Sequence, residues 1–272
     1  PTIRDLLSHR AGFARMGLLW VGGTLTRERM LAYASKAEPV AKFRDEFHYN
    51  NVTYMAGALT AARAAGVTWE ELLQTRLLDP LGMEHTNFDH ASAQKDPQWS
   101  KGYTWRDDLQ KHELEPMRNI DVIGPAGSIN SSVLDMTRWL RMQLAYGSFE
   151  GKEIVSKKNL RKTRSGVIKV GGGIEYGMGW MLQEWGEEDD KKKVVEHGGN
   201  IDGFAASVAF MPEEGLGMVL LTNASMTPLQ QMGHTLVWDA LLTDAYREDP
   251  NPTNEDFSRF TGKYVPDIPG FE

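Results

Sequence analysis

The chain of 272 residues carries a formal net charge of −7, which argues against a nucleic-acid partner because no basic stripe with interleaved aromatic residues offsets it. It contains no cysteine, which excludes disulfides, thiolate metal sites and a cysteine nucleophile. With 41% hydrophobic and 25% charged residues it has the composition of a globular protein, and no apolar run approaches the ~20 residues that span a bilayer. The sequence begins at Pro1 rather than Met, so we expect its native N-terminus, with any targeting signal, to be missing.

The first part of the chain is predicted to be helical. Thr2 is placed to cap a short helix over residues 1–9, which Gly12 ends. The spacing of apolar residues predicts further helices over 25–37, 52–65 and 69–77. A helical region is therefore expected to precede the sheet.

A polar cluster, Tyr49-Asn50-Asn51, stands directly before the helix predicted over 52–65. On these residues alone, a capping asparagine beside a packed tyrosine is the favoured interpretation, because asparagine is a common helix cap. A tyrosine and an amide at the mouth of a helix are also well placed to face a cleft. The local pattern leaves both interpretations open.

Residues 84–120 are polar, rich in Trp and Tyr and weakly periodic, and they predict a long ordered loop over the body of the protein. His85 and His90 lie within it, but their spacing suits no helix face and no carboxylate is clearly placed with them. No metal or other cofactor is therefore predicted. Small residues over 124–132 then form a turn before a helix over 133–146.

The stretch over 194–223 predicts three successive strands joined by tight turns, and we expect it to form the centre of the sheet. Its last strand, over 218–222, is a continuous apolar run, as expected of a strand buried on both faces. His197, Gly198 and Gly199 end the first strand. Paired glycines there would let a ligand lie against the main chain, and the histidine adds a titratable group. A hairpin with a surface histidine is the alternative.

Helices followed by strands and a closing helix imply an α+β fold, in which an antiparallel sheet is flanked by helices beside a helical region. We expect one domain over 1–245, with the helical region over about 1–146 and the sheet region over about 171–245. Residues 246–272 are expected to form a linker and the start of a C-terminal β segment, because the pattern over 257–264 is typical of a first strand.

Four blocks of the sequence match the elements of a known family in order. They are TIRDLLSHRAGF over 2–13, FHYNNVTYMAG through LLDPLGMEHTNF over 47–88, GPAGSINSSVLDMTRWL over 124–140, and YGMGW with EHGGNIDGF over 176–204. Together they resemble the serine β-lactamase and penicillin-binding-protein family, in particular its class C-like branch of D-Ala-D-Ala carboxypeptidases, D-aminopeptidases and esterases. Each block alone is weak, but the resemblance covers nearly the whole chain up to about Ala245, and it implies a β-lactamase/transpeptidase-like fold.

Within this resemblance, Tyr49-Asn50-Asn51 falls on the family's Tyr-x-Asn element. This implies that Tyr49 transfers protons and that the Asn51 side-chain amide faces the substrate. The function it implies is a serine acyl hydrolase that acts on a peptide, amide or ester bond through an acyl-enzyme. The partner would then be a small peptide or ester substrate.

His197-Gly198-Gly199 falls on the family's Lys-Thr-Gly strand element, in its His-x-Gly form. Asn200 would then give a backbone N–H to the oxyanion hole, where a donor is worth ~3 kcal/mol of transition-state stabilisation. A permanent cation suits a β-lactam carboxylate, whereas a histidine near its reference pKa of ~6.5 is charged only part of the time. His197 in place of lysine therefore weakens the case for β-lactam turnover.

The family's nucleophile is the serine of a Ser-x-x-Lys motif, which the resemblance places several tens of residues before the block that begins at Thr2. Ser92-Ala93-Gln94-Lys95 has that spacing, but we interpret it as coincidence because it lies in a polar loop and follows Tyr49. We therefore expect the N-terminal part of the fold to be missing, the missing segment to be a partner of this chain, and the chain alone to be inactive. The alternative is a nucleophile-free relative that binds peptides or a partner.

Overall fold

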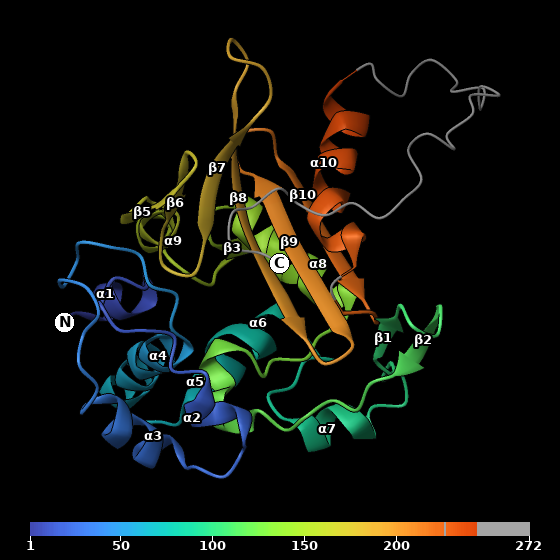
Figure 1. Ribbon diagram of the computed structural model, residues 1–272. Helices are drawn as coiled ribbons and strands as arrows, with labels where there is room; N and C mark the ends of the chain where they lie inside the picture. Colours follow the sequence, from blue (N-terminus) through green and yellow to red (C-terminus); the bar gives the residue numbers. More distant parts are fainter. Residues whose placement is uncertain (226, 244–272) are drawn as a thin grey trace. The chain divides into compact units, whose positions relative to one another are not determined.

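A computed structural model describes residues 1–225 and 227–243 (Figure 1). The chain divides into two compact units, 1–234 and 235–272, which are described separately. The described part of the second unit, 235–243, contains the end of helix α10 (Pro228–Leu242). None of the helices in the described ranges combines the length and the apolar character needed to cross a bilayer.

Most helices of the first unit come from the N-terminal half of the chain. The helices that lie wholly within this unit are α1 (Ile3–Leu7), α2 (Leu18–Val21), α3 (Arg27–Ala34), α4 (Asn51–Ala65), α5 (Trp69–Leu73), π-helix η1 (Gln74–Leu78), α6 (Asp79–Leu81), α7 (His90–Lys95), 3₁₀-helix η2 (Asp121–Ala126), α8 (Val133–Leu144) and α9 (Lys157–Thr163). Side chains of Thr2, Thr26 and Asn50 cap α1, α3 and α4. Helix α4 ends at Gly66, whose φ of 76° is easily adopted only without a side chain.

The strands form one large sheet and two small ones. The six-stranded antiparallel sheet has the order β10-β9-β8-β7-β6-β5, from β5 (Ile168–Gly171), β6 (Ile174–Tyr176), β7 (Met181–Trp185), β8 (Lys192–Ile201), β9 (Phe204–Met211) and β10 (Leu216–Thr222). Each small sheet is one hairpin: β1 (Tyr103–Arg106) pairs with β2 (Lys111–Leu114), and β3 (Ser148–Phe149) pairs with β4 (Lys152–Glu153). The predicted α+β fold with an antiparallel sheet flanked by helices is confirmed.

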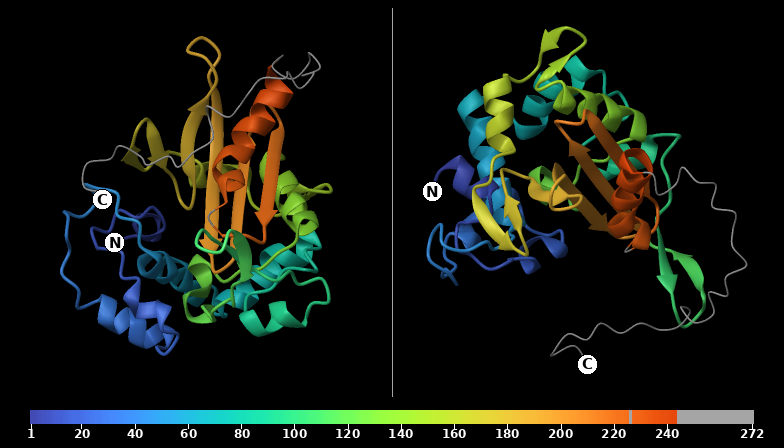
Figure 2. Two further views of the ribbon diagram at one scale, coloured as in Figure 1. Left: turned by 45° about the vertical axis from the view of Figure 1, so that its right-hand side comes forward. Right: turned by 90° about the horizontal axis from the view of Figure 1, so that it is seen from above.

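The large sheet lies on one side of the first unit, and helices α1 to α5 lie on the other (Figures 1 and 2). Helix α8 packs on β9 and β10. The core beside it is built from apolar side chains that include Leu140, Trp180 and Phe210. A separate cluster around Met30 and Met55 holds α3 and α4 together. A third cluster, which includes Leu81 and Met142, packs α6 against α8.

The strand that was predicted to be buried on both faces is an edge strand. Within the described residues β10 pairs only with β9, and its side chains are half-buried or exposed. Its apolar run is explained by contact with α8 on one face, while Leu221 is exposed. The expectation of a central position is correct for β8 and β9, which have neighbours on both sides.

The long loop predicted over 84–120 instead contains regular structure. Helix α7 begins after Asp89, whose carboxylate accepts the Ser92 N–H, and β1 and β2 turn at Gln110 with a φ of 49°. These elements are short and polar, so hydrophobic periodicity could not reveal them. The strand expected over 257–264 lies outside the described residues.

Candidate active site

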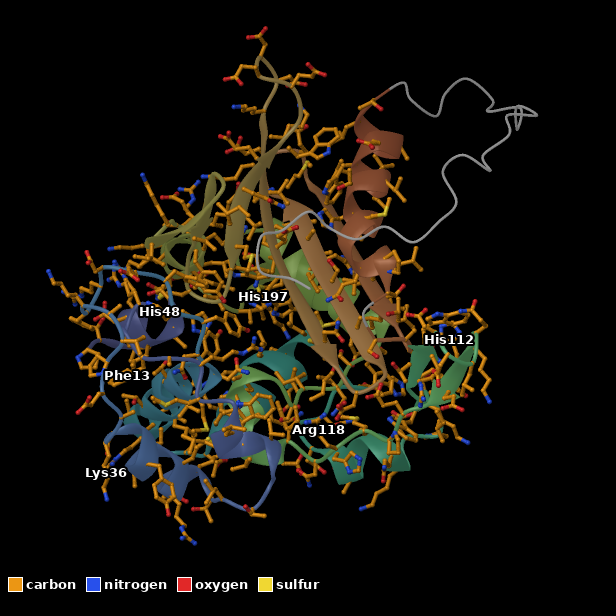
Figure 3. The ribbon with its side chains drawn as sticks, viewed as in Figure 1. Phe13, Lys36, His48, His112, Arg118 and His197 are labelled. Carbon is orange, nitrogen blue, oxygen red and sulfur yellow. The ribbon has the colours of Figure 1, made fainter. Side chains whose placement is uncertain are left out.

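A cleft of about 1080 Å³ lies in the first unit between the helical region and the second half of β8, where Figure 3 labels His197. The expectation that residues 197–199 end this strand is wrong, because its pairing with β9 continues to Ile201. One side, the tyrosine wall, consists of His9, Arg15 and residues 49–51. Another, the strand wall, consists of residues 197–200 of β8. The predicted site residues that line the cleft are Tyr49, Asn51, His197, Gly198, Gly199 and Asn200.

The strand wall has an unpaired edge. Strand β7 pairs with β8 only from Lys192 to Glu196, whereas β9 pairs with β8 as far as Ile201. Among the described strands, therefore, residues 197–201 have a ladder partner on one side only. A side chain placed at Gly199 would meet only Ala206, at 3.9 Å, so the glycine leaves room beside the main chain. An extended ligand can lie along this edge.

His197 is held in one tautomer by two hydrogen bonds. Its Nδ1 lies 2.7 Å from the carbonyl oxygen of Gly198, which can only accept, so Nδ1 carries the proton. Its Nε2 then accepts the Tyr176 hydroxyl, at 3.1 Å. Burial lowers the pKa of His197 and raises that of Tyr176. The histidine is therefore neutral at pH 7.

Tyr49 lies across the cleft from the strand wall, with its ring centroid 6.3 Å from that of His197. The ring of His9 packs against it at 4.2 Å between centroids. Burial raises the pKa of Tyr49, while the guanidinium of Arg15, 5.7 Å from the ring centroid, opposes this rise. The Tyr49 hydroxyl is therefore protonated at neutral pH and is available as a proton donor.

Asn50 fixes the tyrosine wall with three groups. Its side-chain oxygen accepts the Val52 and Thr53 N–H groups at 2.9 and 3.0 Å, and its side-chain nitrogen donates to the Ala14 carbonyl. Its own N–H donates to Nδ1 of His9 at 3.1 Å. The cap interpretation is thus correct for Asn50, while its neighbours on either side line the cleft.

Sequence reasoning missed several residues around Tyr49. His9 is buried, and desolvation lowers its pKa to about 3, with the nearby His197 adding to the effect. Tyr54 stacks with His9, and burial raises its pKa to about 12. His9 and Tyr176 stand in sequence blocks that carried the resemblance, so these blocks were the available signal. Nothing in their spacing indicated that His9 meets Tyr49 or that Tyr176 meets His197.

Met117 and Ile120 line the cleft, and Arg118 between them ties their segment to the turn after β8. Arg118 donates from Nε and Nη2 to the Asp202 carboxylate, at 2.7 Å each, and its backbone N–H donates at 3.0 Å. Although burial opposes it, this bonding holds the pKa of Asp202 below its usual value. The pair keeps the segment before η2 beside the β8–β9 hairpin.

Other residues singled out from the sequence are bonded to other partners. Ser92 is on α7 and does not line the cleft, and its backbone N–H donates to the Asp89 carboxylate. His85 lines the cleft but is bonded to the carboxylate of Asp96 at 3.2 Å. His90 contacts Gln94. In the described ranges no group of three or more His, Asp or Glu side chains is arranged to hold a metal.

A family model described as Beta-lactamase matches residues 1–242. The chain belongs to the β-lactamase family. The resemblance of its four sequence blocks to β-lactamases and penicillin-binding proteins is therefore confirmed. A penicillin-binding protein homologue from Pyrococcus abyssi, solved as an octamer, has a TM-score of 0.71 and 27% identity, covering 86% of this chain and 55% of that one.

Curated relatives of this β-lactamase-family chain include hydrolases. Unguisins hydrolase ungD of Aspergillus violaceofuscus is 27% identical, over 83% of this chain and 43% of that protein. The D-alanyl-D-alanine-carboxypeptidase/endopeptidase AmpH of Escherichia coli K12 is 22% identical, over 76% of this chain and 53% of that protein. The chain thus spans about half the length of these relatives, whose names support a hydrolase role for the family.

Proposed function

We propose that the chain supplies the proton-transfer and carbonyl-binding part of a serine acyl hydrolase that cleaves a peptide, amide or ester bond through an acyl-enzyme. The observation that carries this proposal is the meeting of Tyr49, Asn51 and His197 in one cleft, beside a strand edge with no partner on that side in the described residues. The names of the curated relatives support the hydrolase class.

In the proposed reaction the substrate lies along the unpaired edge of β8. The Asn200 N–H donates to the carbonyl oxygen as it becomes an oxyanion, which contributes ~3 kcal/mol. A serine oxygen forms a bond to the carbonyl carbon, and the bond to the leaving amine or alcohol breaks. Tyr49 gives its proton to the leaving group and takes the proton of the attacking hydroxyl. Water then releases the acyl group by the same route.

His197 and Asn51 support this chemistry without changing charge. A neutral His197 accepts from Tyr176 and so keeps the imidazole fixed beside the substrate edge. The Asn51 amide offers both a donor and an acceptor to a peptide or ester. These roles need no cation on the strand wall. A neutral His197 therefore suits a neutral acyl group better than a lysine at this position would.

The nucleophile is not assigned to any described serine. Ser100, Ser131 and Ser132 line the cleft. Their hydroxyl groups bond to Lys101, to Thr86 and to the Asp135 N–H respectively, and in the described part of the chain none bonds to Tyr49 or His197. A hydroxyl nucleophile needs an adjacent base. We therefore expect the 272-residue chain alone to show no acyl hydrolysis and no labelling by a fluorophosphonate.

The same observation favours a second candidate, a peptide-binding module without a nucleophile. The two candidates differ in the full-length natural protein. The hydrolase predicts stoichiometric fluorophosphonate labelling of one serine there, found by peptide mass spectrometry, whereas the binding module predicts none. Labelling of a serine within the 272-residue chain would show that the nucleophile has been misplaced.

Tyr49→Phe in the full-length protein tests the proton-transfer role. We expect kcat for p-nitrophenyl esters or D-amino-acid amides to fall ~10²- to 10⁴-fold, with a much smaller change in KM, because a general acid acts mainly in the transition state. Tyr33→Phe, on the exposed face of α3, is the matched control and should keep full activity. A Tyr49→Phe enzyme with normal kcat and raised KM would contradict the role.

A further inference from the structure

Helix α9 carries a concentration of positive charge in a chain that is acidic overall. The chain has a net charge of −7, yet residues 154–174 contain six Lys or Arg side chains and no Asp or Glu. Four of the six are exposed on α9 and form its basic face, namely Lys157, Lys158, Arg161 and Lys162. Within the described residues none of these four forms an ion pair, and none lines the cleft.

The spacing of the basic face makes its charges repel one another. Lys157 and Arg161 are four residues apart, as are Lys158 and Lys162, so each pair lies on one side of the helix. Like charges at this spacing destabilise a helix, whereas one acidic residue in each pair would stabilise it. The helix therefore keeps a charge pattern that opposes its own folding when no anion is bound.

Three cations of this region meet at the ring of Tyr146. Their charged groups lie at 4.8 Å for Lys157, 5.3 Å for Arg161 and 5.4 Å for Arg164 from its centroid. Tyr146 has a φ of 54°, a left-handed conformation that costs energy in an aromatic residue. The ring attracts each cation. No carboxylate in the described part of the chain forms an ion pair with any of the three.

Arg164 is the buried member of this group. It is only 8% exposed, and its Nη2 donates to the backbone carbonyl of Gln143 at 2.6 Å. Its Nε is buried and has no hydrogen-bond partner among the described residues. Burial lowers the pKa of Arg164 to about 10, and the charge of Arg161 adds to the fall. Such a guanidinium is costly to bury without a carboxylate, and an anion nearby offsets that cost.

We propose that the basic face and Arg164 bind a soluble ligand that contains two or more linked phosphate groups. One carboxylate has two oxygens, which a single arginine can occupy, whereas each phosphate group adds further acceptor oxygens and charge. A diphosphate can therefore contact Lys157 and Arg161 together and offset the buried charge of Arg164. Between residues 135 and 220 no large apolar side chain is exposed, so this surface lacks the apolar face with which a helix enters a membrane.

Isothermal titration of the full-length natural protein tests the class of ligand. Pyrophosphate is compared with citrate, which carries several charges on carboxylates, at one ionic strength and without divalent metal ions. We expect pyrophosphate to bind about tenfold or more tightly than citrate, and tripolyphosphate to bind more tightly again. Equal affinity for citrate, or no binding of pyrophosphate, would overturn the proposal.

A double variant, Lys157→Gln with Arg161→Gln, locates the site. It should weaken pyrophosphate binding about tenfold or more, because it removes two charge-assisted contacts. The matched control, Arg29→Gln with Lys36→Gln, removes the same charge from exposed positions at α3 and should change Kd less than about twofold. Pyrophosphate that binds the α9 double variant as tightly as the wild type is not bound by the basic face.

Thermal unfolding separates ligand binding from a structural role. Without ligand, the α9 double variant should unfold at the same temperature as the wild type or a higher one, since it loses repulsion between like charges. Saturating pyrophosphate should raise the midpoint of the wild type only. A lower midpoint with unchanged pyrophosphate binding would show that these cations are structural.

Vesicles distinguish a soluble ligand from a membrane surface. Wild-type protein is sedimented with phosphatidylcholine vesicles that contain phosphatidylglycerol, with and without pyrophosphate. We expect little sedimentation, and release by pyrophosphate of any protein that does sediment. Sedimentation that pyrophosphate does not reverse would assign the basic face to a membrane instead. Because no residue of the basic face lines the cleft, these outcomes do not depend on the proposed hydrolase function.

Discussion

The tyrosine wall and the strand wall face one cleft but are held in place by different forces. Residues 197–200 are positioned by the backbone ladder with β9, in a register that runs from Val195 to Ile201. The tyrosine wall is positioned by side chains, because Asn50 connects His9, Ala14 and the start of α4. The strand wall should therefore tolerate side-chain changes that would disrupt the tyrosine wall.

Asn50→Ala should have the largest effect on stability. The change removes the α4 cap and the bond to Ala14, and it leaves buried N–H groups without a partner, at a cost of about 3 kcal/mol in the free energy of unfolding. Urea denaturation measures this cost. Thr26→Ala is the control, because it removes an exposed cap of α3 with one bond to Arg29 and should cost about 1 kcal/mol or less. Equal costs would show that Asn50 is only a cap.

His9 should make the tyrosine wall sensitive to acid. Its pKa of about 3 in the folded protein lies below the reference of about 6.5, so the unfolded chain binds more protons between these values. Stability should fall as pH decreases from 6.5, by up to about 1.4 kcal/mol per pH unit for this group. His197, whose pKa is also lowered, adds to the fall. The pKa of His85 is raised by its bond to Asp96, so its stabilisation is fully present below pH 6.5 and is lost only as the pH rises above that value.

The His9→Asn variant isolates this contribution. Asparagine tolerates the φ of 55° at this position and offers an acceptor in place of Nδ1. Urea denaturation between pH 4.5 and 6.5 should show a shallower dependence on pH than the wild type. His112→Asn, exposed on the β1–β2 hairpin, should leave the slope unchanged. An unchanged slope in His9→Asn would mean that His9 takes up its proton without unfolding.

Substitution of Gln230 should have the smallest effect of these changes, and it tests how the strand wall is oriented. Its side-chain nitrogen donates to the Gly199 carbonyl at 2.8 Å, and that carbonyl shares a peptide group with the Asn200 N–H. The bond should orient and polarise the proposed oxyanion donor. Gln230→Met should therefore lower kcat of the full-length protein roughly three- to tenfold, with KM unchanged. Gln74→Met is the control, because Gln74 is half-buried on η1, bonded to Asp79 and outside the cleft. A change confined to KM would contradict the role.

The difference between the two walls also explains how much the sequence could predict. The turn chemistry and apolar alternation around β8 and β9 are local, so the two strands could be predicted from the residues, although β8 continues past His197 and the two glycines to Ile201. The cap role of Asn50 was predictable for the same reason. The contact of the His9 ring with Tyr49 and the bond from Tyr176 to His197 join separate segments of the chain, and no local pattern encodes such pairs.

The prediction of strand burial failed at β10, because the exposure of a strand depends on which elements lie beside it. The apolar run of β10 has the composition of a buried strand, but the sheet order leaves it at an edge. The short elements over 84–120 were missed because polar helices and hairpins lack hydrophobic periodicity. The family blocks supplied what local patterns could not, namely which polar residues face one another across the cleft.

The bond between Arg118 and Asp202 has a consequence for the order of folding. These residues are 84 positions apart, whereas β8 and β9 are adjacent and can pair early. Contacts between distant residues form late because loop closure opposes them. The cleft is therefore complete only in the fully folded chain, and a ligand bound there at 100 times its Kd should raise the free energy of unfolding by about 2.7 kcal/mol. A thermal-shift screen can thus find cleft ligands without any turnover.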